Sequence, residues 1–419
     1  MSKQALEQLF RHEYGQLVAL LTRRYGVQYF ELVEDSVQYA LTQALSKWQN
    51  KSIPDKPSAW LYQVATRYLI SELRANKRHD ELLKQQLNTP DTDLINSTEA
   101  SAEETKEISF SGELSDSLLR MLFVTCHPSL PIESQLVFTL KSLCGFDIRE
   151  IALRLFIGEA NVYKRFTRAK QFLKSHSIQL DTLDSNEIKS RLPLVHRVLY
   201  LVFTEGYLSS DIDISIRQDL CEEATRLTSL LAQSHLGNTP ETFALLALMY
   251  LNLARISSRQ AAQGLLLLEQ QDRNLWDKTL IATGIRYLQH SAQGQDISRY
   301  HVEAGIAAEH CLAKSFAQTN WHNIAASYQL LERIAPSPLH RLNRAIATAE
   351  AQGTEVALAL LLETDAPSWL VRTYHWYAVL ADLQRRCGDI ASAKANAEKA
   401  IEQAPSIKIK ELLNKRLQC

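Results

Sequence analysis

Cationic and hydrogen-bonding side chains gather in the stretch 147–174, which reads DIREIALRLFIGEANVYKRFTRAKQFLK. Between Glu159 and Lys174 there are five lysines or arginines and one acid. Arginine and lysine pair with phosphates and guanine edges, and asparagine pairs with adenine, so this mixture is typical of recognition in the DNA major groove. The candidate DNA-binding residues here are Arg149, Arg154, Asn161, Tyr163, Lys164, Arg165, Arg168 and Lys170. The alternative interpretation is a surface helix hairpin with solvated charges.

A second set interleaves cations with aromatic rings between residues 48 and 79. Its members are Lys56, Trp60, Arg67, Arg74, Lys77 and Arg78. Unpaired bases stack on aromatic rings while phosphates meet positive charge, so this set suits a separated DNA strand. The alternative interpretation places Trp60 in the core and the cations at a helix C-terminus, where they complement the helix dipole.

A third set is polar and acidic and lies in the periodic stretch 31–48. Glu34, Asp35, Gln38 and Gln43 alternate there with apolar residues at helical spacing. We therefore expect a helix that turns these four side chains outward.

No motif indicates catalysis or a cofactor. H-E-x-x-H, Walker A and G-x-S-x-G patterns are missing, and the 12 histidines show no metal-ligand spacing. The six cysteines form no C-x-x-C pair, which is typical of a reduced cytoplasmic protein without a zinc site. The N-terminal sequence is charged and amphipathic and does not predict a signal peptide, and no apolar run approaches the length of a membrane span. We expect a cytoplasmic protein that is not an enzyme and that binds no cofactor, metal or membrane.

Helices must position these side chains. Glycine and proline are sparse, at 13 and 11 of 419 residues, and long helical periodicities dominate, so the sequence predicts an all-α fold. In 147–174, two apolar stripes separated by Gly158 predict a helix-turn-helix, with Gly158 in a backbone conformation closed to other residues. Residues 1–79 predict three further helices, the third beginning at Pro57 and ending near His79.

Acidic residues separate the two basic regions. The net charge of −1 means that any contact with DNA must come from local patches. Residues 80–116 contain ten acids and two lysines. Apart from a short helical start near Leu82, they lack apolar periodicity. This composition predicts a flexible acidic tether, which we also expect to compete with DNA for the basic surfaces.

The order of these parts resembles the sigma-70 family of bacterial transcription initiation factors, in the extracytoplasmic-function (ECF) form that carries a long C-terminal extension. VEDSVQYALTQAL (33–45) resembles the polymerase-binding helix of region 2, and PSAWLYQVATRYLISELRANKR (57–78) resembles its promoter-melting part. Residues 113–176 look like region 4, with LLRMLFVTCHPSLPIESQLVFTLKSLCGF at 118–146. RVLYLVFTEGYLSS (197–210) and PSPLHRLNRAIATAEAQG (336–353) continue the resemblance into the extension. Gly158 departs from the pattern, because proline is expected in that turn.

The resemblance implies a sigma factor. Its partners would be core RNA polymerase, through the β′ clamp and β subunits, and promoter DNA. The set around Arg165 would read the −35 element, and the set around Trp60 would bind the −10 element after a base flips out. The polar set with Glu34, Asp35, Gln38 and Gln43 would bind polymerase.

Residues 180–419 exceed the usual length of such factors. From about residue 300 a weak repeat appears, clearest at Tyr374–Pro405, where alanines and Gly388 fall at the tetratricopeptide (TPR) spacing. We therefore divide the chain into region 2 (1–79), an acidic linker (80–112), region 4 (113–178), a helical middle domain (179–299) and TPR-like repeats (300–419). The repeats favour a regulatory role and a protein or peptide partner. The alternative function is a TPR-type adaptor, or a helix-turn-helix regulator that does not act through polymerase.

Overall fold

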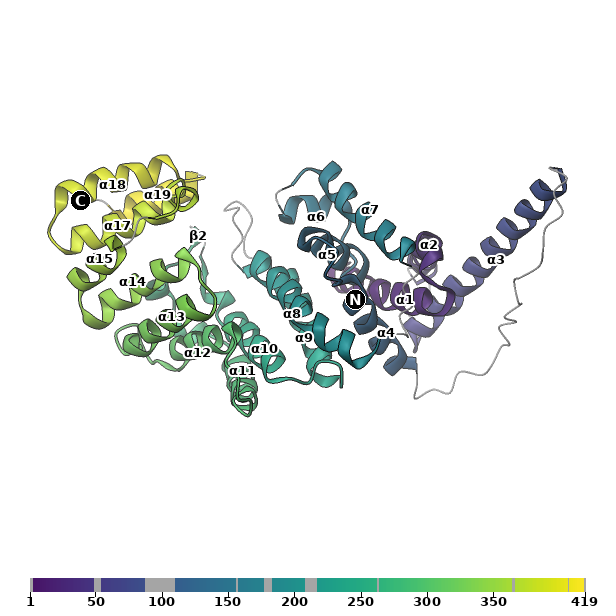
Figure 1. Ribbon diagram of the computed structural model, residues 1–419, viewed down its shortest axis with the longest axis horizontal. Coiled ribbons are helices and arrows are strands. Elements are labelled where there is room, and N and C mark those ends of the chain that lie inside the picture. The colour runs from purple at the N-terminus through teal and green to yellow at the C-terminus, as the bar shows by residue number, and fades with distance from the viewer. Residues whose placement is uncertain are drawn as a thin grey trace. The chain divides into compact units, whose positions relative to one another are not determined.

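The computed structural model describes residues 3–48, 54–86, 110–155, 157–176, 183–207, 217–261, 264–363, 366–405 and 407–417. These residues are almost entirely α-helical (Figure 1), which confirms the fold class predicted from composition and periodicity. The chain divides into two compact units, residues 1–198 and residues 199–419. No helix in the described parts of the chain is both long and apolar enough to cross a membrane.

Unit 1 begins with three helices that share one apolar core. They are α1 (Lys3–Tyr25), α2 (Phe30–Trp48) and α3 (Pro57–Gln86), with the 3-10 helix η1 (Val27–Tyr29) before α2. Fully buried residues recur at helical spacing in each helix: Leu17 and Leu21, Val33, Val37 and Ala40, and Leu61, Ala65 and Leu69. Tyr39 of α2 stacks on Tyr68 of α3 with ring centroids 4.4 Å apart, which fastens these two helices together.

The expectation that the third helix ends near His79 is wrong. Helix α3 continues to Gln86, and the next helix, α4 (Phe110–Thr125), begins within the segment expected to be a tether. The turns of α3 after His79 have weak apolar periodicity. They are helical because they extend a helix whose earlier turns are already held by the core, and extending a helix is easier than starting one. The remaining acids of the predicted tether, from Asp91 to Glu107, lie outside the described residues.

Four described helical segments follow α4 before α8 begins. They are α5 (Ile132–Phe138), the π-helical turn η2 (Thr139–Leu143), α6 (Ile148–Leu155) and α7 (Glu159–Ser175). Gly145 follows η2 with φ 71°, a left-handed conformation that glycine adopts without strain. The chain can therefore reverse between η2 and α6, and α6 and α7 form the predicted helix-turn-helix.

Helix α8 (Ser185–Tyr207) follows the helix-turn-helix. Its segment VLYLVF is helical, in agreement with the predicted all-α fold. The buried Arg191 donates a hydrogen bond to the carbonyl of Phe123, 3.4 Å away, and pairs with Glu187 one turn earlier. These contacts attach the start of α8 to α4.

Unit 2 is also helical, with one minimal hairpin. Its α-helices are α9 (Gln218–Gln233), α10 (Pro240–Leu253), α11 (Lys278–Ser291), α12 (Arg299–Leu312), α13 (Trp321–Ile334), α14 (Pro338–Gln352), α15 (Thr354–Leu362), α16 (Ser368–Val371), α17 (Tyr374–Arg386), α18 (Ile390–Glu402) and α19 (Ile407–Leu417). Short 3-10 helices are η3 (Ile256–Ser258), η4 (Leu268–Gln270) and η5 (Arg273–Leu275). Strands β1 (Gln260–Ala261) and β2 (Gly264–Leu265) pair antiparallel, with Gln260 opposite Leu265.

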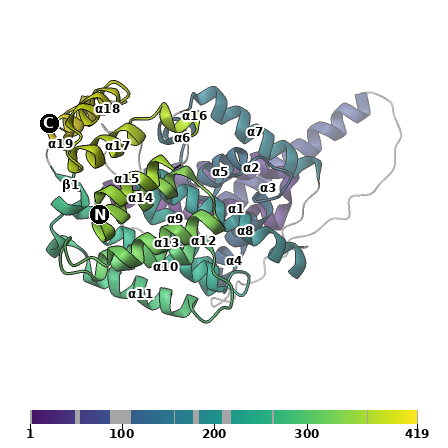
Figure 2. The same cartoon turned by 60° about the vertical axis from the view of Figure 1, so that its left-hand side comes forward.

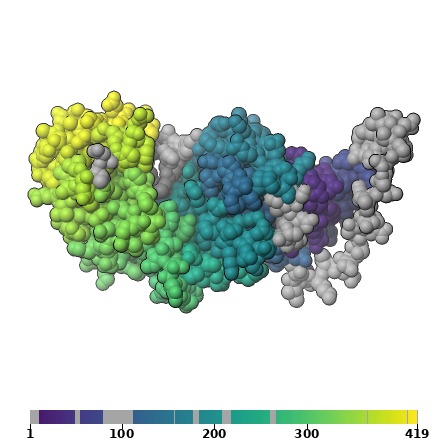
Figure 3. All heavy atoms as spheres, in the orientation of Figure 1, coloured from purple at the N-terminus to yellow at the C-terminus, as the bar shows by residue number. Residues whose placement is uncertain are grey.

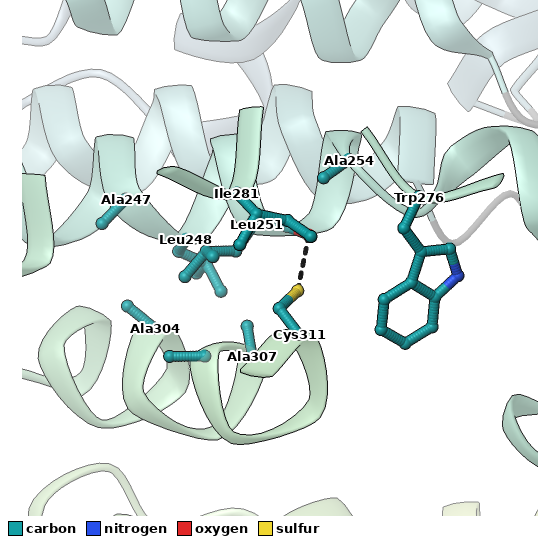
Figure 4. Close-up of a cluster of buried hydrophobic side chains, with 10 residues drawn as sticks. Ala247, Leu248, Leu251, Ala254, Trp276, Ile281, Ala304, Ala307 and Cys311 are labelled. Atoms are coloured by element: carbon teal, nitrogen blue, oxygen red, sulfur yellow. Dashed lines mark hydrogen bonds between the residues drawn. The ribbon is translucent and has the colours of Figure 1, made fainter. Parts of the chain in front are cut away.

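One apolar cluster joins α10, α11 and α12. Leu248 and Leu251 of α10 face Ala304 and Ala307 of α12, so small residues let the helices approach closely (Figure 4). The Cys311 thiol donates to the carbonyl of Leu251 at 3.5 Å, and Trp276 closes the cluster with 2% of its surface exposed. Burying each large apolar side chain of this kind contributes about 1.5–3 kcal/mol.

The last helices of unit 2 pack as successive pairs. Helix α13 packs against α14, and α17 packs against α18, which in turn contacts α19. Figure 2 shows α13, α14, α15, α17 and α18 following one another in order, and Figure 3 shows the green and yellow atoms of this part in close contact. Gly388 lies in the turn between α17 and α18 with φ 85°, the turn position predicted from the repeat. Ala381, Ala397 and Ala400 are buried between these helices.

Candidate nucleic-acid interface

Helix α7 has one buried and one exposed face. Its buried residues are Val162, Phe166, Ala169 and Leu173, the stripe predicted from the sequence. On the opposite side Asn161, Lys164 and Arg168 are exposed and Arg165 is half-buried. These positions fall at i, i+3, i+4 and i+7 and therefore share one side of the helix. An amide and three cations on one side can donate hydrogen bonds to phosphates and base edges together.

Helix α6 is capped at its start, and the turn after it leads into α7 through Gly158. Asp147 accepts a hydrogen bond from the Glu150 backbone N–H at 2.7 Å, and the Glu150 side chain accepts one from the Asp147 N–H at 2.8 Å. This reciprocal capping box holds the first turn of α6. The expectation for Gly158 is wrong, because its φ is −65° and its ψ is 146°, values open to most residues. Proline, which the family resemblance leads one to expect there, has the same φ.

Three of the predicted DNA-binding residues already contact carboxylates. Arg149 is 83% exposed and lies 3.9 Å from the Glu159 carboxylate. Arg154 is 17% exposed, lies 3.8 Å from Glu150 and stacks over the Phe146 ring. Lys170 pairs with Glu31 of α2 at 2.7 Å, and this pairing holds the pKa of the Glu31 carboxyl below its usual value. Tyr163, by contrast, is 57% exposed beside the face described above.

Helix α3 carries the second basic set along its exposed side. Arg67, Arg74, Lys77 and Arg78 are all exposed, and together with Ile70 and Ser71 they line an open groove of about 720 Å³. Arg74, Lys77 and Arg78 lie 7, 10 and 11 residues after Arg67, so the four cations follow one side of the helix over about three turns. This surface places positive charge in a row, as a nucleic-acid backbone requires. Lys56 is exposed just before the helix begins.

Trp60 is half-buried in an aromatic cluster at the start of α3. Its ring lies 5.4 Å from Trp48, which in turn lies 5.8 Å from Phe10, and the Lys47 ammonium lies 5.6 Å from the Trp60 ring. The structure therefore gives Trp60 a packing role, although the residue as a whole is only half-buried.

Helix α2 exposes only part of the predicted polymerase-binding set. Asp35 and Gln38 are exposed and Gln43 is half-buried, but Glu34 has 7% of its surface exposed. The expectation that Glu34 faces outward is therefore wrong. Its carboxylate accepts a hydrogen bond from the Tyr14 hydroxyl at 2.9 Å and lies 3.9 Å from the Lys141 ammonium. Burial raises the pKa of Glu34, since the loss of water outweighs Lys141 and Tyr14.

Lys141 belongs to η2, so this buried contact joins the two halves of unit 1. At the same junction α1 touches η2 so closely that a Cβ on Gly15 would lie 2.0 Å from the Leu143 carbonyl oxygen. Arg11 of α1 pairs with Glu150 and lies over Phe146. Further on, Phe30 of α2 packs against Phe138, with ring centroids 5.3 Å apart. We call this set of contacts the α1–η2 junction.

The sequence predicted neither the α1–η2 junction nor two ion pairs between α1 and α4. Arg23 pairs with Asp116 at 2.8 Å and Arg24 pairs with Glu113 at 3.3 Å, and both acids belong to the acidic stretch 80–116 that was expected to be a flexible tether. The partners lie roughly ninety positions apart in the chain. No local pattern connects residues at that separation, so periodicity alone could not have found these pairs.

Comparison with known proteins matches both halves of unit 1. Residues 9–79 match the family model for Sigma-70 region 2, and residues 120–173 match the one for Sigma-70, region 4. The chain belongs to the sigma-70 family. Residues 191–292 match a Family of unknown function (DUF6596), so this is an ECF-like sigma factor with a C-terminal extension.

The sigma factor has a relative over most of its length. An uncharacterized protein of Rhizobium meliloti (strain 1021) is 32% identical over 375 residues, which are 89% of this chain and 86% of that protein. No solved structure matches the chain.

The two basic surfaces lie within the residues that match sigma-70 regions 2 and 4. Region 2 contains most of α1, all of α2 and most of α3, including the groove on α3, and region 4 contains the end of α4 together with α5, α6 and most of α7. The protein is therefore a DNA-binding sigma factor for transcription initiation, which interacts with RNA polymerase and promoter DNA. Among the residues the structure describes, no group of three or more His, Cys, Asp or Glu is arranged to hold a metal ion.

Proposed function

We propose that this sigma factor binds core polymerase through α2, reads the −35 element with α7 and binds the melted −10 element with α3. The observation that carries the proposal is the exposed side of α7, which projects an amide and three cations from a helix-turn-helix. We assign these roles to residues 1–79 and 113–178, which the stretch 80–112 connects. Residues 179–299 and 300–419 form the extension, which we assign to regulation.

For the −35 element, Asn161, Lys164, Arg165 and Arg168 face the base edges, with Tyr163 beside them. Arg149 is placed to contact a phosphate, because its side chain is 83% exposed at the start of α6. Arg154 and Lys170 join the phosphate contacts once DNA replaces their carboxylate partners, since phosphate competes for the same donors.

For the −10 element, the row Arg67, Arg74, Lys77 and Arg78 follows the backbone of one strand, and Lys56 meets the strand ahead of it. Trp60 offers the exposed part of its ring to a flipped base. Binding the open strand more tightly than the duplex favours melting without any catalytic group.

For polymerase, the exposed side of α2 offers Asp35 and Gln38 beside Leu45, which is 40% exposed. Gln43 lies at the edge of this surface and Glu34 lies behind it. An apolar side chain among polar ones is a common composition for a protein interface. We assign this surface to the β′ clamp and assign region 4 to the β subunit.

The α1–η2 junction must open for both elements to be bound together. The elements are about 25 base pairs apart, which is roughly 85 Å of duplex at 3.4 Å per base pair. A compact body of about 170 residues has a radius of gyration of about 15 Å, and even the 30-residue helix α3 is only about 45 Å long. Regions 2 and 4 therefore cannot reach both elements while they remain packed together. We propose that the junction is closed in the free factor and that binding of polymerase separates it.

The proposal is tested with alanine variants of Arg165 and Arg168 in transcription reconstituted with core polymerase. The templates are promoters recovered by sequencing the DNA that the holoenzyme binds. Since an arginine–guanine contact discriminates by about 1–3 kcal/mol, each variant should lower −35-dependent initiation roughly 5- to 150-fold. Binding to core polymerase should persist.

Lys189→Ala is the matched control, because Lys189 is an exposed cation on α8, outside the proposed surface. It should leave initiation unchanged. If the Arg165 or Arg168 variant loses core binding, or initiates like the wild type, α7 does not read the promoter.

A further inference from the structure

A cavity of about 770 Å³ lies inside unit 2, between helices of its last part. Its walls come from α13, α14, α17 and α19, and η4 closes one side. The volume falls in the range of sites that hold ligands or short peptide segments. No element of the proposed promoter-binding machinery contributes to it.

One wall of the cavity carries more positive charge than the carboxylates beside it can balance. The cations are Arg385, Arg386, Lys415 and Arg416, and the nearby acids are Asp382 and Glu350. Three arginines share the Asp382 carboxylate, with nitrogen–oxygen distances between 3.2 and 3.9 Å. Arg386 also bonds Glu350 at 2.8 Å. Four cations thus face two carboxylates.

Lys415 is the cation most available to a ligand. It is exposed on α19 and makes no ion pair with any residue in the described ranges. Glu269 of η4 is a third acid that lines the cavity, and among the described residues it forms no ion pair with the four cations. The α17–α19 wall is therefore complementary to a ligand with two negative charges.

The opposite part of the cavity is apolar. Phe316, Trp321, Ile324 and Ile346 line it, and Ile346 is 37% exposed. The Trp321 ring is held in place, because its indole N–H donates to the Phe316 carbonyl at 3.2 Å and the His310 ring meets it edge-on. A rigid aromatic surface of this kind provides contact area for a bulky side chain at low entropic cost.

We propose that this cavity binds an acidic peptide segment of a partner protein, with two carboxylates on the α17–α19 wall and a bulky apolar side chain against Trp321. The proposed function assigns the extension to regulation, and this inference says what kind of partner the extension would bind. It rests on the proposed function only in that assignment. The binding test below uses neither polymerase nor promoter, so its failure leaves promoter recognition untouched.

The test is selection of displayed random twelve-residue peptides on the immobilised full-length protein. Enriched peptides should carry at least two Asp or Glu residues next to an aromatic or large aliphatic residue. The tightest one, labelled with fluorescein, then reports affinity by anisotropy. Lys415→Glu should weaken its binding about tenfold or more, and raising the salt concentration should weaken it further.

Lys410→Glu is the matched control. Lys410 is exposed on the same helix but does not line the cavity, so this variant should bind like the wild type. Lys415 makes no ion pair within the described structure, so its replacement leaves the fold intact, which circular dichroism verifies.

Enrichment of neutral or basic peptides, no enrichment at all, or equal binding by Lys415→Glu would overturn the proposal. Dimerisation of the protein that Lys415→Glu abolishes would instead assign the cavity to a second copy of the chain. That outcome would also overturn it.

Discussion

Gly158 and Gly145 flank α6 and have opposite backbone requirements. Gly158 is the N-cap of α7, has a negative φ, makes no side-chain cap and leaves open space where a Cβ would lie. Gly145 has φ 71° and would place a Cβ 3.1 Å from the Arg11 backbone. The first position therefore accepts other residues, and the second does not.

Gly158→Ser should stabilise the protein by about 1 kcal/mol. Serine at an N-cap accepts a backbone N–H of the first turn and restricts the unfolded chain. Gly145→Ser should instead destabilise it by about 1–2 kcal/mol, because a side chain at positive φ is strained and the site is crowded. Urea unfolding measures both changes. Equal shifts in the same direction would contradict this account of the turn.

His196 makes unit 1 sensitive to acid. It is 3% exposed in α8, and burial lowers its pKa from 6.5 to about 4. Between pH 6.5 and 4, therefore, the His196 imidazole binds a proton in the unfolded chain but stays neutral in the folded chain. The contribution of neutral His196 to the free energy of unfolding is fully present above pH 6.5 and is lost as the pH decreases towards 4.

From pH 7 to pH 5 this group should cost the wild type about 2 kcal/mol of unfolding free energy. His196→Leu keeps an apolar side chain of similar size and has no proton to bind, so its profile should be flatter by that amount. Urea unfolding at the two pH values measures the difference. Parallel profiles for the two proteins would show that His196 is charged, or accessible, in the folded state.

At the scale of elements, the close approach of α1 to η2 controls how regions 2 and 4 pack. Gly15→Ala adds a methyl group where the Leu143 carbonyl oxygen lies 2.0 Å away, so α1 and η2 must separate. The same change favours the helix itself, because alanine has the higher helix propensity. Region 2 therefore stays folded while the α1–η2 junction weakens.

We predict that Gly15→Ala binds core polymerase several-fold more tightly, since more of the factor is already open. Amide hydrogen exchange in η2 should also accelerate. Gly112→Ala is the control, because Gly112 lies in α4 with nothing within 4 Å of its Cβ position. Unchanged core affinity together with accelerated exchange would show that the α1–η2 junction does not compete with polymerase.

Elements with strong periodicity could be predicted from the sequence, and contacts between distant elements could not. The stripe from Val162 to Leu173 identified α7 and its exposed side, because a 3.6-residue period depends on local order alone. Glu34 was misplaced because its burial depends on Lys141, more than a hundred positions away. Lys170 was expected to be available for DNA, and its partner Glu31 lies 139 positions away in the sequence.

For the whole molecule, each unit has a core of its own. The helix-turn-helix and region 2 lie in residues 1–198, and the helical extension forms a second unit with its own apolar clusters. The resemblance of the sequence to the sigma-70 family predicted region 2, the helix-turn-helix and the helical extension, because the family blocks extend over most of the chain. The cavity beside Trp321 could not be anticipated, since four helices must assemble before its charges converge.

The most direct measurement is run-off transcription with purified core polymerase on genomic templates, with and without this protein. The account predicts that core polymerase alone gives no defined start, and that adding the protein produces discrete transcripts. Their start sites should share one −35 and one −10 sequence. Transcripts that begin at the same scattered positions in both reactions would contradict it.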